Sequence, residues 1–286
     1  MAFTGITRGD ALGTRYAFWG VKLGAYLNGV SISTLTNGTA SSMARARSIT
    51  EYAITRPAAT AVAKVGDNGS FGTWTLNPTE AVTGNSGFAV FDETFETVAT
   101  GRKIYTDGAY RVVDDSLDCL DYTPLVLILN SPATSQEVAT KGQKGYYVHI
   151  YQSATASPSG ETYNNNTAVG FPYSLIFDEV SQDIFGTAIT DANFGVTQSY
   201  RRRFFSPYPV HGGAYVGTGV SAQEIVTDFT PAAATANAVQ VAIAGTRRVI
   251  TTDFTVTTAT KTIAFTGTLP AAGAQAVYLY QFIPEC

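Results

Sequence analysis

The 286-residue chain is poor in charged residues, in cysteine and histidine, and in long apolar runs. Charged residues make up 14% of the sequence, against about 25% in ordinary soluble domains. The formal net charge of −4 excludes an overall basic field that would hold nucleic acid by counterion release. Low charge is typical both of subunits that bury surface against one another and of well-packed monomers, and composition alone leaves both open.

The two cysteines, Cys119 and Cys286, are too few and too far apart for a disulfide scaffold or a zinc site. Two free thiols fit a reducing cytoplasm. The N-terminal segment has no apolar signal region, and no stretch approaches the roughly 20 apolar residues of a membrane span. We therefore expect a soluble protein assembled in a reducing cytoplasm, without a membrane partner.

The last quarter of the chain alternates apolar and polar residues in four short runs separated by turn residues. A period of two is typical of half-buried strands, and Thr, Val, Ile and aromatic residues suit a pleated surface. The alternating positions are Phe254 with Val256, Ile263 with Phe265, and Val277 with Leu279 opposite Tyr278, Tyr280 and Phe282.

The rest of the chain adds further strand candidates and predicts an all-β fold, mainly antiparallel. We expect a sandwich or barrel body with at most one or two short helices and a small C-terminal β-module. Leu125–Leu129 is apolar on both faces and predicts a central, covered strand. The other candidates are Gly72–Leu76, Phe88–Phe95, Arg102–Tyr105, Tyr110–Val113, Tyr146–Gln152 and Phe171–Phe177.

Four segments have less regular patterns. Ser41–Arg56 is ambiguous: its first part fits a short helix capped by Ser41 or Ser42, and its second half fits a strand equally well. Capping-box patterns at Thr134 and Ser221 could each open a short helix, although Pro231 follows the second within ten residues. The polar segment Ser153–Thr167 predicts a loop or hairpin tip.

The small-residue stretch Thr230–Ala238 is typical of a linker. It divides a body at residues 1–229, with an N-terminal arm over residues 1–40, from a C-terminal β-module at 239–286. Because the module is too small for a rich core, we expect it to lean on the body or on a neighbour.

Catalytic and metal-binding patterns are sparse, and we assign no catalytic, cofactor-binding or metal-ligating residue. His149 and His211 are the two histidines, and a lone histidine is more often structural than catalytic. The acidic segment Asp114–Asp121 lacks the spacing of a calcium loop and is better explained as a solvated turn. Its Cys119 is a poor nucleophile beside carboxylates. Gly66–Gly72 lacks the strand–helix context of a dinucleotide site.

Other polar groups carry equally weak signals. The carboxylates of Asp92, Glu93 and Glu96 cannot be given a glycosidase role without geometry. The basic run Arg201–Arg203, flanked by aromatic residues, favours a contact between subunits over nucleic acid, since real nucleic-acid footprints are broader. The sequons at Asn37, Asn68 and Asn165 are chance matches if the protein is never secreted.

The C-terminal motifs resemble small β-modules of tailed-bacteriophage virion proteins. In those modules a strand like Asp253–Val256 pairs with one like Thr262–Phe265, and a turn like Pro270–Ala274 leads into a closing strand. The body is also similar, more generally, to tail-tube proteins, which stack rings, usually hexamers, around a DNA channel. The resemblance implies a structural subunit that binds itself and other virion proteins, with DNA as non-specific passing cargo.

Under this hypothesis the chain is a virion protein without catalysis and without a cofactor. The arm at residues 1–40 and the loop Ser153–Thr167 are the segments expected to order on assembly. Alternatives are a head decoration, collar or fibre-associated virion protein, and a carbohydrate-binding adhesin whose sugars would stack near Tyr163 and Tyr208. An enzyme such as a depolymerase has no visible set of catalytic residues.

Overall fold

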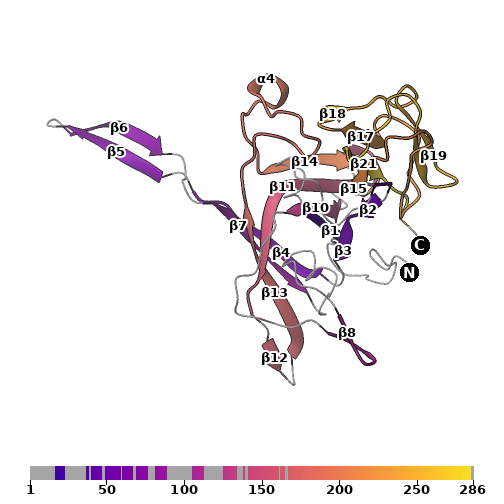
Figure 1. The fold of residues 1–286 in the computed structure, drawn as a ribbon. Helices are drawn as coiled ribbons and strands as arrows, with labels where there is room; N and C mark the ends of the chain where they lie inside the picture. The colour runs from indigo at the N-terminus through magenta and orange to yellow at the C-terminus, as the bar shows by residue number, and fades with distance from the viewer. Residues whose placement is uncertain are drawn as a thin grey trace.

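The fold was derived from a computed structural model, which describes residues 17–22, 37–38, 40–46, 49–58, 60–66, 69–76, 81–88, 105–112, 125–133, 138, 141–160, 162–164 and 167–284. It is built almost wholly of antiparallel strands, as the sequence predicts (Figure 1). The short helix α4 (Asp191–Phe194) ends at Gly195, which takes the left-handed conformation common after helices. The all-β prediction is therefore confirmed.

The largest sheet has nine strands, in the order β3-β1-β10-β11-β13-β7-β4, with β14 paired to β11 and β12 paired to β13. Its strands are β1 (Ala17–Lys22), β3 (Ala44–Ala46), β4 (Ile49–Thr55), β7 (Val82–Phe88), β10 (Leu125–Pro132), β11 (Tyr146–Pro158), β12 (Thr162–Asn164), β13 (Thr167–Phe177) and β14 (Arg201–Ser206).

A five-stranded sheet in the order β18-β17-β21-β15-β2 packs on one face of the large sheet. A three-stranded sheet, β16-β20-β19, adds to the same core. Their strands are β2 (Ala40–Ser42), β15 (Val210–Val216), β16 (Glu224–Val226), β17 (Val239–Ile243), β18 (Thr246–Arg247), β19 (Phe254–Thr257), β20 (Thr262–Phe265) and β21 (Gln275–Gln281).

Two hairpins stand apart from these sheets and pair only with themselves among the described strands: β5 (Thr60–Gly66) with β6 (Gly69–Leu76), and β8 (Tyr105–Asp107) with β9 (Tyr110–Val112). The β5–β6 hairpin projects far from the body, whereas the yellow C-terminal strands gather beside β15 on the opposite side (Figure 1).

The central strands are covered on both faces, as the apolar pattern of Leu125–Leu129 predicts. On β10, Val126 and Ile128 belong to the core shared with the five-stranded sheet. Leu125, Leu127 and Leu129 face a second core, formed where the nine-stranded sheet curls over itself. The alternating side chains of β10 therefore point into two different cores, one on each face of the strand.

Strand β11 contains a β-bulge, and the strand that pairs with one of its edges changes there. Leu127 pairs with Tyr151 but Leu125 pairs with Ala154, so β11 carries one extra residue there. Before the bulge the other edge of β11 pairs with β14, and after it with β13. A bulge bends a strand and re-aims its side chains. Here it leaves Gln152 buried, with its Oε1 accepting the N–H of Ile184 at 3.0 Å.

The C-terminal alternation is confirmed, and β21 is more deeply buried than a half-covered strand. Tyr278, Tyr280 and Phe282 are almost fully buried, and Leu279 on the opposite face is 7% exposed. β21 pairs with β15 of the body on one side and with β17 on the other. Residues on both sides of 230–238 therefore share one core, and the division into domains at that stretch stays a prediction.

Two local predictions are wrong. Ser153–Thr167 is mostly strand, because β11 runs to Pro158 and pairs with β13. The capping-box pattern at Ser221 opens no helix: Ala222 has a φ of 62° and the chain enters β16. β7 covers Val82–Phe88, and residues 89–95 of the strand predicted at Phe88–Phe95 lie outside the described residues.

Two further segments are described in part. The short helix considered for the first part of Ser41–Arg56 does not form, because β2 and β3 occupy it, and the strand considered for the second half is β4. The helix predicted from Thr134 falls partly outside the described residues; in the described part, the N–H of Gly142 donates to the carbonyl of Val138.

Candidate functional site

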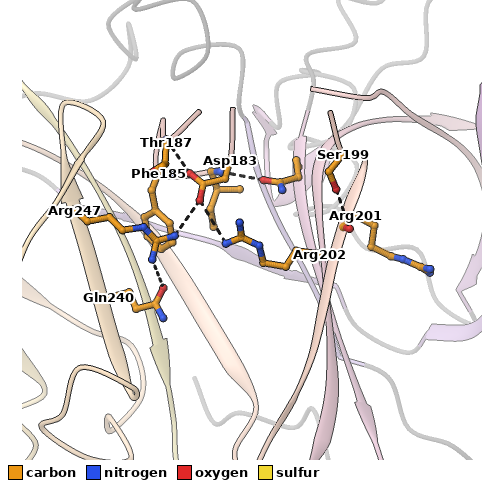
Figure 2. A network of polar contacts seen from close by, with 10 residues as sticks. Asp183, Phe185, Thr187, Ser199, Arg201, Arg202, Gln240 and Arg247 are labelled. Carbon is orange, nitrogen blue, oxygen red and sulfur yellow. Dashed lines mark hydrogen bonds and ion pairs between the residues drawn. The ribbon is translucent and has the colours of Figure 1, made fainter. Parts of the chain in front are cut away.

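Asp183 lies at the junction between β14 and the C-terminal strands and is 1% exposed. Its Oδ1 accepts the backbone N–H groups of Phe185 (2.9 Å) and Thr187 (3.0 Å). When an aspartate carboxylate accepts hydrogen bonds from backbone N–H groups two to four residues later, it closes a tight turn. The carboxylate is thus fixed by its own segment, and its second oxygen points toward two arginines (Figure 2).

Those arginines come from two different sheets. Arg247, in β18, lies 3.0 Å from Asp183 Oδ2, and Arg202, in β14, lies 3.4 Å from the same oxygen. Their side chains are 43% and 28% exposed, respectively. One buried carboxylate therefore ties the nine-stranded sheet to the five-stranded sheet through two charged contacts.

The arginines are held in defined orientations. The Arg247 guanidinium lies 4.5 Å from the centre of the Phe185 ring, in cation–π geometry. Its Nη1 also donates to Gln240 Oε1 at 3.2 Å. Burial lowers the pKa of Arg202, and the nearby carboxylate of Asp183 acts in the opposite direction.

A cavity of about 260 Å³ opens beside this cluster. Arg202 and Arg247 line it together with amide side chains and an apolar wall, and none of its lining residues is acidic. The lining residues are Ile150, Gln152, Ile184, Phe185, Arg202, Phe204, Val210, Asn237, Ala238, Gln240, Arg247, Leu279, Tyr280 and Gln281. The arrangement can bind an anion; it contains no nucleophile paired with a general base.

The basic run predicted from the sequence does not form one patch. Successive residues of β14 face opposite sides of the sheet, so only Arg202 reaches the cavity. Arg201 lies over the rings of Tyr151 and Tyr200, at 6.0 and 5.6 Å. Arg203 is exposed and pairs across the sheet with His149.

No protein-family model matches the chain, and no curated protein matches it. The candidate site therefore rests on geometry alone.

His211 is 1% exposed and lies among the rings of Phe229, Tyr280 and Phe282. Its Nε2 lies 3.2 Å from the Met43 carbonyl, and its Nδ1 lies 3.3 Å from the Tyr280 hydroxyl. Both contacts are satisfied by a neutral ring that donates from Nε2 and accepts at Nδ1. This histidine links β15, β21 and the chain beside β2.

His149 is half-buried on β11, and its Nδ1 is buried without a hydrogen-bond partner among the described residues. Burial lowers its pKa, and Arg203 lowers it further. The structure places His149 and His211 on different strands, with different partners, and brings neither into the cavity.

Several predicted positions lie outside the described residues: the acidic segment Asp114–Asp121 with Cys119, the carboxylates Asp92, Glu93 and Glu96, and Cys286. The glycine-rich segment Gly66–Gly72 falls at the tip of the β5–β6 hairpin and in β6. Within the described ranges, no group of three His, Cys, Asp or Glu side chains could hold a metal ion. None of the helices in those ranges is long and apolar enough to cross a membrane.

Of the positions expected to bind sugar, Tyr208 is 38% exposed, and Tyr163 lies in β12. The sequence reasoning missed Asp183 and Arg247. The only local signals were turn glycines close to each: Gly186 after the aspartate and Gly245 before the arginine, both with positive φ.

Proposed function

We propose that this chain is a structural subunit of a tailed-phage virion. Copies of it assemble into the rings of a tail tube around a DNA channel, and the subunit acts without catalysis. The observation that carries the proposal is the projecting β5–β6 hairpin (Figure 1). The resemblance of the C-terminal motifs to virion modules supports the assignment to a phage particle.

The hairpin extends a pair of strands that belong to the body. β4 and β7 pair within the nine-stranded sheet, and the chain between them forms β5 and β6 beyond the sheet. Pro57, two residues after the end of β4, has no N–H to continue the ladder. A two-stranded hairpin alone is only marginally stable in water. A neighbouring subunit would supply the surface that stabilises it.

An open sheet edge adjoins the base of this hairpin. β4 is the last strand of its sheet, so its outer edge has no partner strand among the described residues. Such an edge is a template for pairing with another chain. In a closed ring every copy uses the same contact surfaces, so repeated pairing at β4 and the hairpin would leave no free edge there.

The charge of the chain fits a channel for passing DNA. A net charge of −4 opposes tight phosphate binding, so DNA would slide through a ring rather than adhere to it. The hairpin segment 60–76 itself carries only Lys64 and Asp67 as charged residues, which suits a contact between subunits.

The test replaces residues 60–76 by a short Gly-Ser turn in the full chain. Because β5 and β6 pair only with each other among the described strands, we expect the melting temperature of the monomer to stay unchanged. The higher oligomers that we expect for the unmodified protein in sedimentation velocity should disappear. A matched change that shortens the β8–β9 turn should leave assembly in place. Unchanged oligomers after removal of β5–β6 would overturn the role of the hairpin.

A further inference from the structure

The cavity beside Asp183 has no acidic residue in its lining. Two guanidinium groups line it, and the one carboxylate that they share lies beneath them with both oxygens in use. Partly buried cations are most stable when each has an anionic partner. A second carboxylate entering the cavity would give Arg247 an anionic partner besides the one that it shares with Arg202.

Arg247 has hydrogen-bond donors for such a group. A guanidinium carries five N–H groups in a rigid plane. One of them is donated to Asp183 and another to Gln240, and the rest have no partner among the described residues. Contact with the Phe185 ring fixes the plane, so the donors are oriented before a ligand arrives.

Part of the cavity lining is apolar. Ile150, Val210 and Leu279 line it and belong to the core shared by the two sheets. The volume, about 260 Å³, is below the range of about 300–1,000 Å³ for drug-sized ligands. A space of this size fits a small organic acid, or one acidic side chain together with the residue next to it in the inserted chain.

We propose that this cavity is a binding site for a carboxylate carried on an apolar body. The carboxylate pairs with Arg247 and Arg202, and the apolar body packs on the wall formed by Ile150, Val210 and Leu279. The group could come from a free small acid or from an Asp or Glu side chain of a second copy of this chain. The site does not depend on the tail-tube proposal.

The direct test titrates full-length protein with phenylbutyrate and, separately, with the neutral phenylbutyramide, using calorimetry and the NMR signal of Arg247 Nε. We expect saturable binding of the acid, a shift of the Arg247 signal, and binding of the amide roughly tenfold to a hundredfold weaker, as for the loss of a charge-assisted hydrogen bond. Equal binding of the two compounds, or no binding of either, would overturn the proposal.

Two variants separate the site from general charge effects. Arg247→Gln should weaken phenylbutyrate binding by roughly ten- to a hundredfold, whereas Arg203→Gln, which removes the same charge from the same region, should not change it. An equal loss in both variants contradicts the site. Should Arg247→Gln fail to fold, the comparison of acid with amide on the unmodified protein still decides.

The effect of phenylbutyrate on self-association distinguishes the two possible sources of the carboxylate. If phenylbutyrate binds and also dissociates oligomers, the natural occupant is an acidic side chain of a second copy. If it binds and leaves the oligomers intact, the occupant is a free acid. Oligomers that form while phenylbutyrate fails to bind would overturn this inference and leave the proposed assembly function standing.

Discussion

The side chain of Asn130 and the backbone of Val210 exchange two hydrogen bonds between the two main sheets. Val210 N–H donates to Asn130 Oδ1 at 2.7 Å, and Asn130 Nδ2 donates to the Val210 carbonyl at 3.0 Å. Asn130 is 0% exposed. A single amide therefore satisfies both polar groups of one residue of β15 inside the core and fixes how the sheets align.

Replacing this amide should be costly. Asn130→Ala leaves the N–H and the carbonyl of Val210 buried without these partners, and each such group costs about 1–3 kcal/mol. We expect the free energy of unfolding in urea to fall by about 2–4 kcal/mol. Asn85→Ala, at an exposed position on β7, is the control and should change it little. Similar losses in both variants would show that Asn130 has no special role.

The Asp183 cluster gives a second stability prediction. Asp183→Asn keeps the shape but leaves Arg202 and Arg247 without their shared carboxylate. Because both arginines are partly exposed, we expect a loss of about 1–3 kcal/mol in urea unfolding, less than for a fully buried pair. The same change at Asp107, which is exposed in β8, should have almost no effect. A neutral outcome at Asp183 would mean that the cluster does not hold the sheets together.

His149 predicts a pH dependence of stability. Burial and Arg203 lower its pKa in the folded protein, whereas the unfolded chain titrates near about 6.5. Above that pH the ring is neutral in both states. Below it the unfolded chain takes up a proton that the folded protein resists, so the free energy of unfolding falls as the pH drops from about 6.5 toward the folded pKa.

An NMR titration of the His149 ring checks this prediction. The measured pKa should lie below about 6.5, and Arg203→Gln should raise it toward that value by removing the neighbouring charge. Lys144→Gln removes a positive charge from an exposed site and should leave the pKa unchanged. A pKa above about 6.5 in the unmodified protein would contradict the environment described for His149.

The turn between β17 and β18 can be improved. Ala244 and Gly245 both have positive φ, at 47° and 78°, as in the tight hairpin turns that favour Asn-Gly. An alanine is strained in this region, whereas Asn tolerates it. Ala244→Asn should raise the free energy of unfolding by about 0.5–1 kcal/mol. Ala259→Asn, in a turn without positive φ at that residue, is the control and should not stabilise; a gain there alone would refute the explanation.

The strand pattern could be predicted wherever burial follows the period of two. Phe254, Ile263 and Phe265 are buried as their alternation indicates, because each sits in a short strand with one covered face. β7 could not be predicted, since Gly84, Asn85 and Ser86 have low β-propensity; its position between β13 and β4 decides its conformation.

The candidate site could not be predicted, because its charged residues meet only through the fold. Asp183 and Arg247 are far apart in sequence and come together when β18 packs against the segment before α4. In the run Arg201–Arg203, sequence cannot tell which side chain turns inward. The register of β14 on β11 decides that only Arg202 lines the cavity.

Electron microscopy of the purified full-length protein, at concentrations where sedimentation shows association, tests the central claim most directly. The account predicts rings of identical subunits that stack into hollow tubes, with the β5–β6 hairpin lying against the neighbouring subunit. A protein that stays monomeric at every concentration, with no rings or tubes in the micrographs, would contradict it.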